Sequence, residues 1–175
     1  MANHRIVVEN LRRDGAKILQ RRQADLRYNL RLTSKGVVHA DTEGSPPSLI
    51  VPNAPFIGQR WEVNSELALV ESRTFAAQDR LRGRHLWLPL TARVDGFNET
   101  ISIPAGSFAG CLRLTLTGQR TVRIDRGNAY AEVVVTQKEW YAPAVGLVKL
   151  VRTERSTSRF LRDGLYRQQL LEFGD

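Results

Sequence analysis

The chain has 175 residues, of which 42% are hydrophobic and 25% are charged, and its formal net charge is +8. This size and composition suit one globular domain with its own core, so we expect a single domain over residues 1–175 and exclude a globally disordered chain. No apolar run approaches the ~18 residues of a membrane-spanning helix. Cys111 is the single cysteine, which excludes an intramolecular disulfide.

The N-terminal part of the chain alternates apolar and polar residues with a period of two. Ile6–Leu11 and Lys17–Arg22 do so weakly, and Asp14-Gly15 between them predicts a hairpin turn. Ala24–Thr33 is the clearest run. On a strand its apolar and charged residues lie on opposite faces, whereas on a helix the charged residues would fall within the apolar face. Ser34–Gly36 then predicts a reversal. These patterns predict strands rather than helices.

Ala40–Gly58 has a different composition, with four prolines and several large apolar residues. Proline cannot donate to a central ladder, so the segment does not suit an ordinary core strand. Its apolar residues, Leu49 and Phe56 among them, are too many for a free linker. We therefore expect an ordered loop, or a short helix, that covers the concave face of a sheet.

The rest of the chain returns to short alternating runs. They are Glu66–Phe75, His85–Val94, Leu112–Thr117, Ala129–Val135 and Tyr166–Phe173. Asp95-Gly96, Thr117-Gly118 and Asp163-Gly164 predict reversals between strands, the last as a hairpin turn after Arg159–Arg162. Regular short strands favour a sandwich, a barrel or an open curved sheet, and the lack of βαβ spacing excludes a doubly wound parallel fold.

The sequence contains no pattern of residues typical of a reactive centre. His4, His39 and His85 lie far apart and show no metal-ligand spacing with Cys111. No nucleophile elbow, P-loop or dinucleotide-binding motif occurs. Cys111 lies in an alternating run, where we expect a small buried strand residue. We predict no catalytic residue, no metal ligand and no cofactor.

Three patterns occur in a fixed order along the chain. They are PPSL followed by VP and GQRW within Pro46–Trp61, GFNETISIPAGSF in Gly96–Phe108, and WYAPAVGLVK in Trp140–Lys149. Together they resemble a family of bacterial exported, lipoprotein-like domains of uncharacterised function, with patterns similar to PPL…P…GxxW, GxETVxVPAGxF and WYAPGVGLVK. The resemblance covers residues 46–150. It implies a curved antiparallel sheet related to the half-barrel of the Lol lipoprotein carriers, and a place in the bacterial envelope, but no activity.

The residues of these patterns have structural interpretations of their own. Pro104 ends a strand, Gly106 permits a tight reversal and Phe108 returns to the core. Glu99 is the only acid in the second pattern, and we interpret it as a cross-strand partner for an arginine. Ala144 stands where the family pattern has glycine, and it would be strained if its φ were positive.

The fold that we expect is mainly β: one curved antiparallel sheet, a half-barrel or open barrel, with the proline-rich segment over its concave face. Its function is expected to be non-enzymatic, with a lipid-like or other apolar small molecule, or a partner protein, bound in the concave sheet. The expected ligand contacts are Leu49, Phe56, Trp61, Trp140 and Tyr141. The expected location is periplasmic or outer-membrane-associated if a leader has been removed, and cytoplasmic otherwise.

Two other functions stay open. The positive charge, with Arg80, Arg82 and Arg84 in alternation, suits a module that binds nucleic acid or an anionic membrane surface. Nucleic acid is disfavoured, because the sequence lacks the recognised motifs and the interleaved exposed aromatics of such modules. A hydrolase or isomerase whose site assembles only in space is the other alternative.

Overall fold

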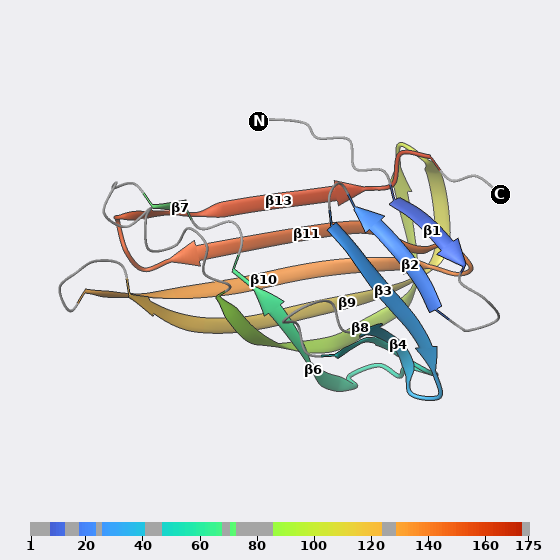
Figure 1. Cartoon of the computed structure of the whole chain (residues 1–175). Helices are drawn as coiled ribbons and strands as arrows, with labels where there is room; N and C mark the ends of the chain where they lie inside the picture. The colour runs from blue at the N-terminus through green and yellow to red at the C-terminus, as the bar shows by residue number, and fades with distance from the viewer. Residues whose placement is uncertain are drawn as a thin grey trace. The chain divides into compact units, whose positions relative to one another are not determined.

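The computed structural model describes residues 8–12, 18–23, 26–40, 47–67, 71–72, 86–123 and 129–172 (Figure 1). Within these ranges the secondary structure is strand, with no helix. The chain divides into two compact units, Met1–Pro55 and Phe56–Asp175. The expectation of a single domain over residues 1–175 stays a prediction.

The first unit is a five-stranded antiparallel sheet in the order β1-β2-β3-β4-β5. Its strands are β1 (Val8–Arg12), β2 (Ile18–Gln23), β3 (Leu26–Thr33), β4 (Gly36–Ala40) and β5 (Ser48–Pro52). The pairing of β1 with β2 confirms the predicted hairpin, although Asp14-Gly15 lies outside the described residues. The reversal at Ser34–Gly36 is also confirmed, since β3 pairs with β4 across it.

The expectation of a loop or short helix throughout Ala40–Gly58 is wrong for Ser48–Pro52. These residues form β5, which pairs with β4 at the end of the sheet. Proline is tolerated there because an edge strand has one row of backbone groups outside the ladder, and Pro52 is also the last residue of the strand. Whether the segment covers a concave face stays a prediction.

The second unit is built on a six-stranded antiparallel sheet in the order β13-β11-β10-β9-β8-β6. Its strands are β6 (Arg60–Glu66), β8 (Trp87–Ile103), β9 (Gly106–Arg123), β10 (Tyr130–Ala142), β11 (Gly146–Ser156) and β13 (Gly164–Gln169). A small separate sheet pairs β7 (Glu71–Ser72) with β12 (Leu161–Arg162).

Two predicted reversals are absent because β8 and β9 run straight through them. At Asp95-Gly96 the register of β8 against β9 shifts, so an irregularity in the ladder takes the place of a turn. At Gly118 a Cβ would lie 2.6 Å from the carbonyl oxygen of Pro89 and 2.7 Å from Leu90. Glycine is needed there for the close approach of β8, and the same residue type that suggested a turn instead permits packing.

The predicted hairpin at Asp163-Gly164 is also wrong. The residues before it form β12, which pairs with β7, whereas β13 pairs with β11. Leu161 explains the departure, because it is buried with Val122, Ala131 and Val133 under the end of the sheet. Burial of this apolar residue draws β12 away from the ladder that β13 joins.

Burial alternates along the long strands and gives the six-stranded sheet a buried inward face and a wet outward face. On β8 and β9 the inward residues are apolar and almost fully buried: Leu88, Leu90, Ala92, Val94, Leu114 and Leu116. Their removal from water contributes about 25 cal/mol per Å² of apolar surface. Cys111 is fully buried on β9, which confirms its interpretation as a core residue.

The six-stranded sheet curls strongly about its inward face. The Arg152 Nη1 atom on β11 donates to the Ser65 Oγ atom on β6 over 2.7 Å. These strands are four places apart, which is about 19 Å in a flat sheet and far more than one side chain spans. The sheets are antiparallel, open and consistent with a curved sheet, so the expected mainly β class is confirmed.

Candidate functional site

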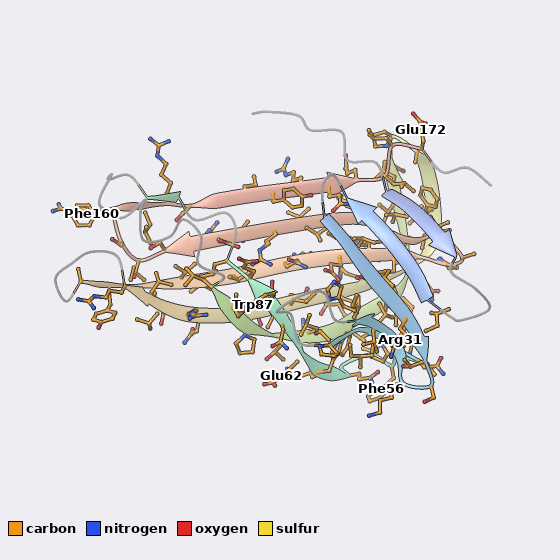
Figure 2. The ribbon with its side chains drawn as sticks, viewed as in Figure 1. Arg31, Phe56, Glu62, Trp87, Phe160 and Glu172 are labelled. Atoms are coloured by element: carbon orange, nitrogen blue, oxygen red, sulfur yellow. The ribbon has the colours of Figure 1, made fainter. Side chains whose placement is uncertain are left out.

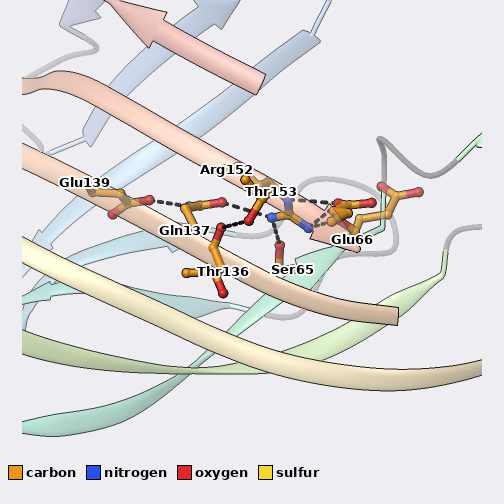
Figure 3. Close-up of polar contacts among 8 residues, drawn as sticks. Ser65, Glu66, Thr136, Gln137, Glu139, Arg152 and Thr153 are labelled. Carbon is orange, nitrogen blue, oxygen red and sulfur yellow. Dashed lines mark hydrogen bonds and ion pairs between the residues drawn. The ribbon is translucent and has the colours of Figure 1, made fainter. Parts of the chain in front are cut away.

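Arg152 holds together a chain of polar side chains on the inward face (Figure 3). Its Nε and Nη2 atoms each lie 2.8 Å from Oε1 of Glu154. Its Nη1 atom also donates to Oε1 of Gln137 over 2.9 Å, and its Nη2 atom donates to the backbone carbonyl of Glu66 over 2.6 Å. Glu154 is fully buried and Arg152 nearly so. This guanidinium therefore joins β10, β11 and β6 across the interior of the sheet.

Glu139 extends this chain along β10. The Gln137 amide donates to its Oε1 atom over 2.5 Å, and the Tyr141 hydroxyl donates to its Oε2 atom over 2.7 Å. Burial raises the pKa of Glu139 above the usual range of a carboxyl group, although the two hydrogen bonds and the charge of Arg152 act in the opposite direction. We call Ser65, Gln137, Glu139, Arg152 and Glu154 the inner polar chain.

The charge balance of the inner polar chain agrees with this shift. Arg152 is fully matched by Glu154, so a proton on Glu139 leaves the chain neutral, whereas its loss leaves one uncompensated buried charge. A carboxyl group that keeps its proton can donate a hydrogen bond or act as a general acid. The Gln137 and Tyr141 hydrogen bonds engage both of its oxygens.

A second set of polar residues lies on β8, β9 and β10, toward the hairpin that joins β8 to β9. The Asp95 carboxylate accepts from Arg93 over 2.8 Å and from the Thr115 hydroxyl over 2.5 Å. Burial acts to raise the pKa of Asp95, but the bonds from Thr115 and Arg93 and the charges of Arg93 and Arg113 outweigh it, so the pKa is lowered.

Arg113 forms ion pairs with both Asp95 and Glu99, and so connects Glu99 to this set. Glu99 also accepts from the Trp140 indole over 2.8 Å, and the Lys149 ammonium lies 5.0 Å from the centre of that indole ring. The interpretation of Glu99 as a partner for an arginine is confirmed. We call Arg93, Asp95, Glu99, Arg113 and Trp140 the outer polar chain.

The outer polar chain brings residues of the second and third sequence patterns into contact. Glu99 belongs to the second pattern, and Trp140 and Lys149 belong to the third. The apolar residues of the two patterns pack together as well, around Cys111, Ala142 and Val148. Gly58 of the first pattern lies near the second, since its N–H donates over 2.9 Å to the carbonyl of Val94, two residues before that pattern. The second and third patterns thus meet at one end of the curled sheet.

The five expected ligand contacts lie on β5, β6 and β10 and in the segment before β6. Trp61 is half-buried on β6 and alternates with exposed residues, and Tyr141 is half-buried beside Glu139. Trp140 instead contacts Glu99 and Lys149 in the outer polar chain. Phe56 is 63% exposed at the start of the second unit, and Leu49 is half-buried in the first unit. Their joint role in ligand binding stays a prediction.

Half-buried apolar side chains lie on β6 and β13, the two edge strands of the curled sheet, and on β11 next to β13. Trp61 and Val63 precede Ser65 on β6, and Leu150 precedes Arg152 on β11. The two strands run in the same direction, so the bond between Ser65 and Arg152 places Val63 and Leu150 on the same side of it. Tyr166, opposite Arg152 on β13, completes the set. We call Trp61, Val63, Leu150 and Tyr166 the margin residues.

The inner polar chain was missed from the sequence, although a signal for it exists. The alternation of buried residues on β10 runs through Ala131, Val133 and Val135 and then continues through Gln137 and Glu139. Polar residues at positions of an alternating pattern that should be apolar are the mark of a buried network. On the sequence alone, the same residues also fit the end of a buried strand.

Other sites are few in the part of the chain that the structure describes. No three His, Cys, Asp or Glu residues there are placed to hold a metal ion. A surface depression of about 490 Å³ lies at the turn after β11 and is lined by Ser156–Asp163 except Phe160. No apolar helix of bilayer-spanning length occurs among the described residues.

Comparison of the chain with models of known protein families, with curated proteins and with solved structures finds no significant match. The resemblance to exported, lipoprotein-like domains therefore rests on the three sequence patterns, and it stays a prediction.

Proposed function

We propose that this protein is a non-enzymatic binding module of the bacterial envelope, and that its curled sheet holds an amphipathic, lipid-like molecule along the inward face. The observation that carries the proposal is the division of that face. Its β8 and β9 residues are apolar, whereas β10 and β11 add a buried carboxyl, an amide and an ion pair. A ligand with an apolar chain and a polar head matches both halves.

The margin residues are the part of this face that supports entry. Trp61, Val63, Leu150 and Tyr166 are half-buried, so they combine apolar contact area with partial access to solvent. Such residues suit contact with an acyl chain, because burial of an exposed methylene contributes about 0.8 kcal/mol. The Glu139 carboxyl, whose pKa is raised by burial, and the Tyr141 hydroxyl would face the polar head of the ligand.

The test uses displacement of a dansyl-labelled undecanoic acid from the whole protein. Wild-type protein is expected to enhance the dansyl fluorescence, and oleic acid is expected to displace the probe. Trp61→Ala should weaken binding at least tenfold, since an indole on a margin supplies a large apolar contact. Absence of any enhancement up to 100 µM protein would contradict the proposal.

Trp87→Ala is the matched control. Trp87 is also a half-buried tryptophan, but it lies next to the inward residue Leu88 on β8 and so points to the opposite face. This variant should change probe affinity by less than twofold. Equal losses in the two variants would show that the probe senses general destabilisation and not the inward face.

The same buried carboxyl gives a reason to test for enzymatic acid catalysis as the second function. A carboxyl with a raised pKa is a common feature of general acids. Turnover of chromogenic esters and glycosides that is lost in Glu139→Gln but retained in Asp95→Asn would favour an enzyme over a binding module.

A further inference from the structure

The end of the sheet that is remote from the sequence patterns carries a separate feature. There β9 ends, β10 begins, and the turn after β11 leads into β12 and β13 (Figure 1). Four arginines at this end are exposed, and so are two aromatic residues. We call these six residues the basic tip: Arg123, Tyr130, Arg155, Arg159, Phe160 and Arg162.

The basic tip has a rigid base. Leu161 is buried with Val122, Ala131 and Val133 directly beneath it. The turn after β11 is also tied by hydrogen bonds: the Thr157 N–H donates to the carbonyl of Glu132 over 3.0 Å, and the Ser156 N–H donates to the Asp163 carboxylate over 3.0 Å. The exposed side chains are therefore displayed from a fixed surface.

The aromatic residues of the basic tip are exposed to an unusual extent for their size. Tyr130 is 59% exposed and Phe160 is 44% exposed. Figure 2 shows Phe160 directed away from the strands at the end of the sheet. The Arg159 guanidinium lies 5.1 Å from the centre of the Phe160 ring, so the apolar ring and the cation are presented together.

Arginines outnumber the described acids around the basic tip. Three such acids lie there, Glu71, Glu132 and Asp163, against four arginines: Glu71 is opposite Arg162 in the pair of β7 and β12, and Asp163 already accepts from the backbone of Ser156. Arg159 and Arg162 line the depression together with the hydroxyls of Ser156, Thr157 and Ser158. Guanidinium and hydroxyl donors around a shallow depression match phosphate oxygens.

We propose that the basic tip docks on an anionic phospholipid surface, with lipid phosphates at the depression and the Phe160 and Tyr130 rings at the level of the headgroups. Aromatic rings with polar neighbours favour this interface, and each arginine near an anionic bilayer strengthens binding severalfold. This inference is independent of the ligand proposed for the inward face.

A nucleic acid fits the basic tip less well. Binding of single strands uses a groove with aromatic faces on which successive bases stack. Here one face of the Phe160 ring is already covered by Arg159. The depression is bounded by a single turn of the chain, residues 156–163, and does not extend as a groove.

The test is sedimentation of the whole protein with vesicles of phosphatidylcholine alone or with 30% phosphatidylglycerol. We expect binding to the anionic vesicles only, weakened in 0.5 M salt. Arg159→Ala with Arg162→Ala should lower the partition coefficient about 10- to 30-fold, because each arginine contributes on the order of fivefold. Both side chains are exposed, so their loss should leave the melting temperature unchanged.

Arg60→Ala with Arg167→Ala is the charge-matched control. Both residues are exposed, and the strand register places both level with Lys138, eight residues along β10 from Tyr130. This variant should lose less than threefold. Phe160→Ala should lower vesicle binding in high salt as well, whereas Phe97→Ala, at a 37% exposed phenylalanine elsewhere, should not.

Three results would overturn the proposal. The first is no binding to anionic vesicles at low salt. The second is an equal loss in the two double variants, which would reduce the effect to net charge. The third is tighter binding to a 30-nucleotide single strand than to the vesicles, with the same dependence on Arg159 and Arg162, which would make nucleic acid the partner.

Discussion

The inner and outer polar chains are built from the same kinds of residue but lie in different surroundings. Each has arginines, carboxylates and hydroxyl or indole donors that connect three strands of the curled sheet. In the inner chain the Arg152 and Glu154 side chains are 9% and 0% exposed, whereas in the outer chain Arg93 and Arg113 are 50% and 36% exposed around an Asp95 side chain that is 6% exposed. The two chains therefore differ in the burial of their arginines.

The two chains shift the pKa of a carboxyl in opposite directions. For Asp95, whose side chain is only 6% exposed, the bonds from Thr115 and Arg93 and the charges of Arg93 and Arg113 outweigh the cost of burial, and the pKa falls. For Glu139, burial outweighs two hydrogen bonds and the charge of Arg152, and the pKa rises. The direction of the shift therefore depends on whether the partners of a buried carboxyl outweigh the cost of its burial.

The largest effect that we expect is from breaking the inner chain at Arg152. Arg152→Met removes the ion pair of the fully buried Glu154 with the guanidinium, and the donor to Gln137. The free energy of unfolding should fall by about 3–5 kcal/mol. Urea denaturation monitored by tryptophan fluorescence measures this change.

Arg93→Met is the matched change in the outer chain. Arg93 is half exposed, and Asp95 keeps its bond from Thr115, so the loss should stay below about 1 kcal/mol. Similar losses in the two variants would contradict the comparison between the chains, and would show that water reaches the inner one.

The next effect concerns pH. The folded protein holds the Glu139 proton more tightly than the unfolded chain, so stability falls as pH rises through the raised pKa, by up to about 1.4 kcal/mol per pH unit. Glu139→Gln should remove this loss, since its amide can accept from Gln137 and donate to Tyr141. Denaturation curves across pH 4 to 9 test this expectation.

Asp95→Asn should change the acid end of the dependence of stability on pH. The pKa of Asp95 is lowered in the folded state, so its contribution is present above the ordinary pKa of an aspartate and is lost as pH falls through the folded pKa. The variant should flatten the acid limb and leave the neutral limb as in the wild type. A change in the neutral limb would show that the two chains are coupled.

The smallest effect on the free energy of unfolding is expected at the hairpin between β10 and β11. This hairpin connects the strand of Trp140, in the outer chain, to the strand of Arg152, in the inner chain. Ala144 has a φ of 61°, a left-handed conformation that disfavours a Cβ. Ala144→Gly should raise the free energy of unfolding by about 0.5–1 kcal/mol in thermal denaturation. Ala109→Gly, in β9 and without a positive φ, should lower it instead. A loss in Ala144→Gly would contradict the strain.

Several sequence predictions succeeded because they depended on neighbours along the chain. The alternation in Ala24–Thr33 predicted β3, and Ser34–Gly36 predicted the reversal from β3 into β4. Glycine was less informative at Gly96 and Gly118, where a ladder irregularity and a close strand replaced the expected turns. Glycine permits all three roles, and only the neighbouring strand selects one.

The sequence by itself determined that this protein is built from antiparallel strands, since a period of two commits each residue to one of two faces. It also indicated the arginine contact of Glu99. Only the tertiary structure decided that the six-stranded sheet curls enough to bring Arg152 to Ser65, and that Trp140 reaches Glu99. These contacts join residues far apart in sequence or on different strands, and curvature and strand order, which local periodicity does not encode, bring them together.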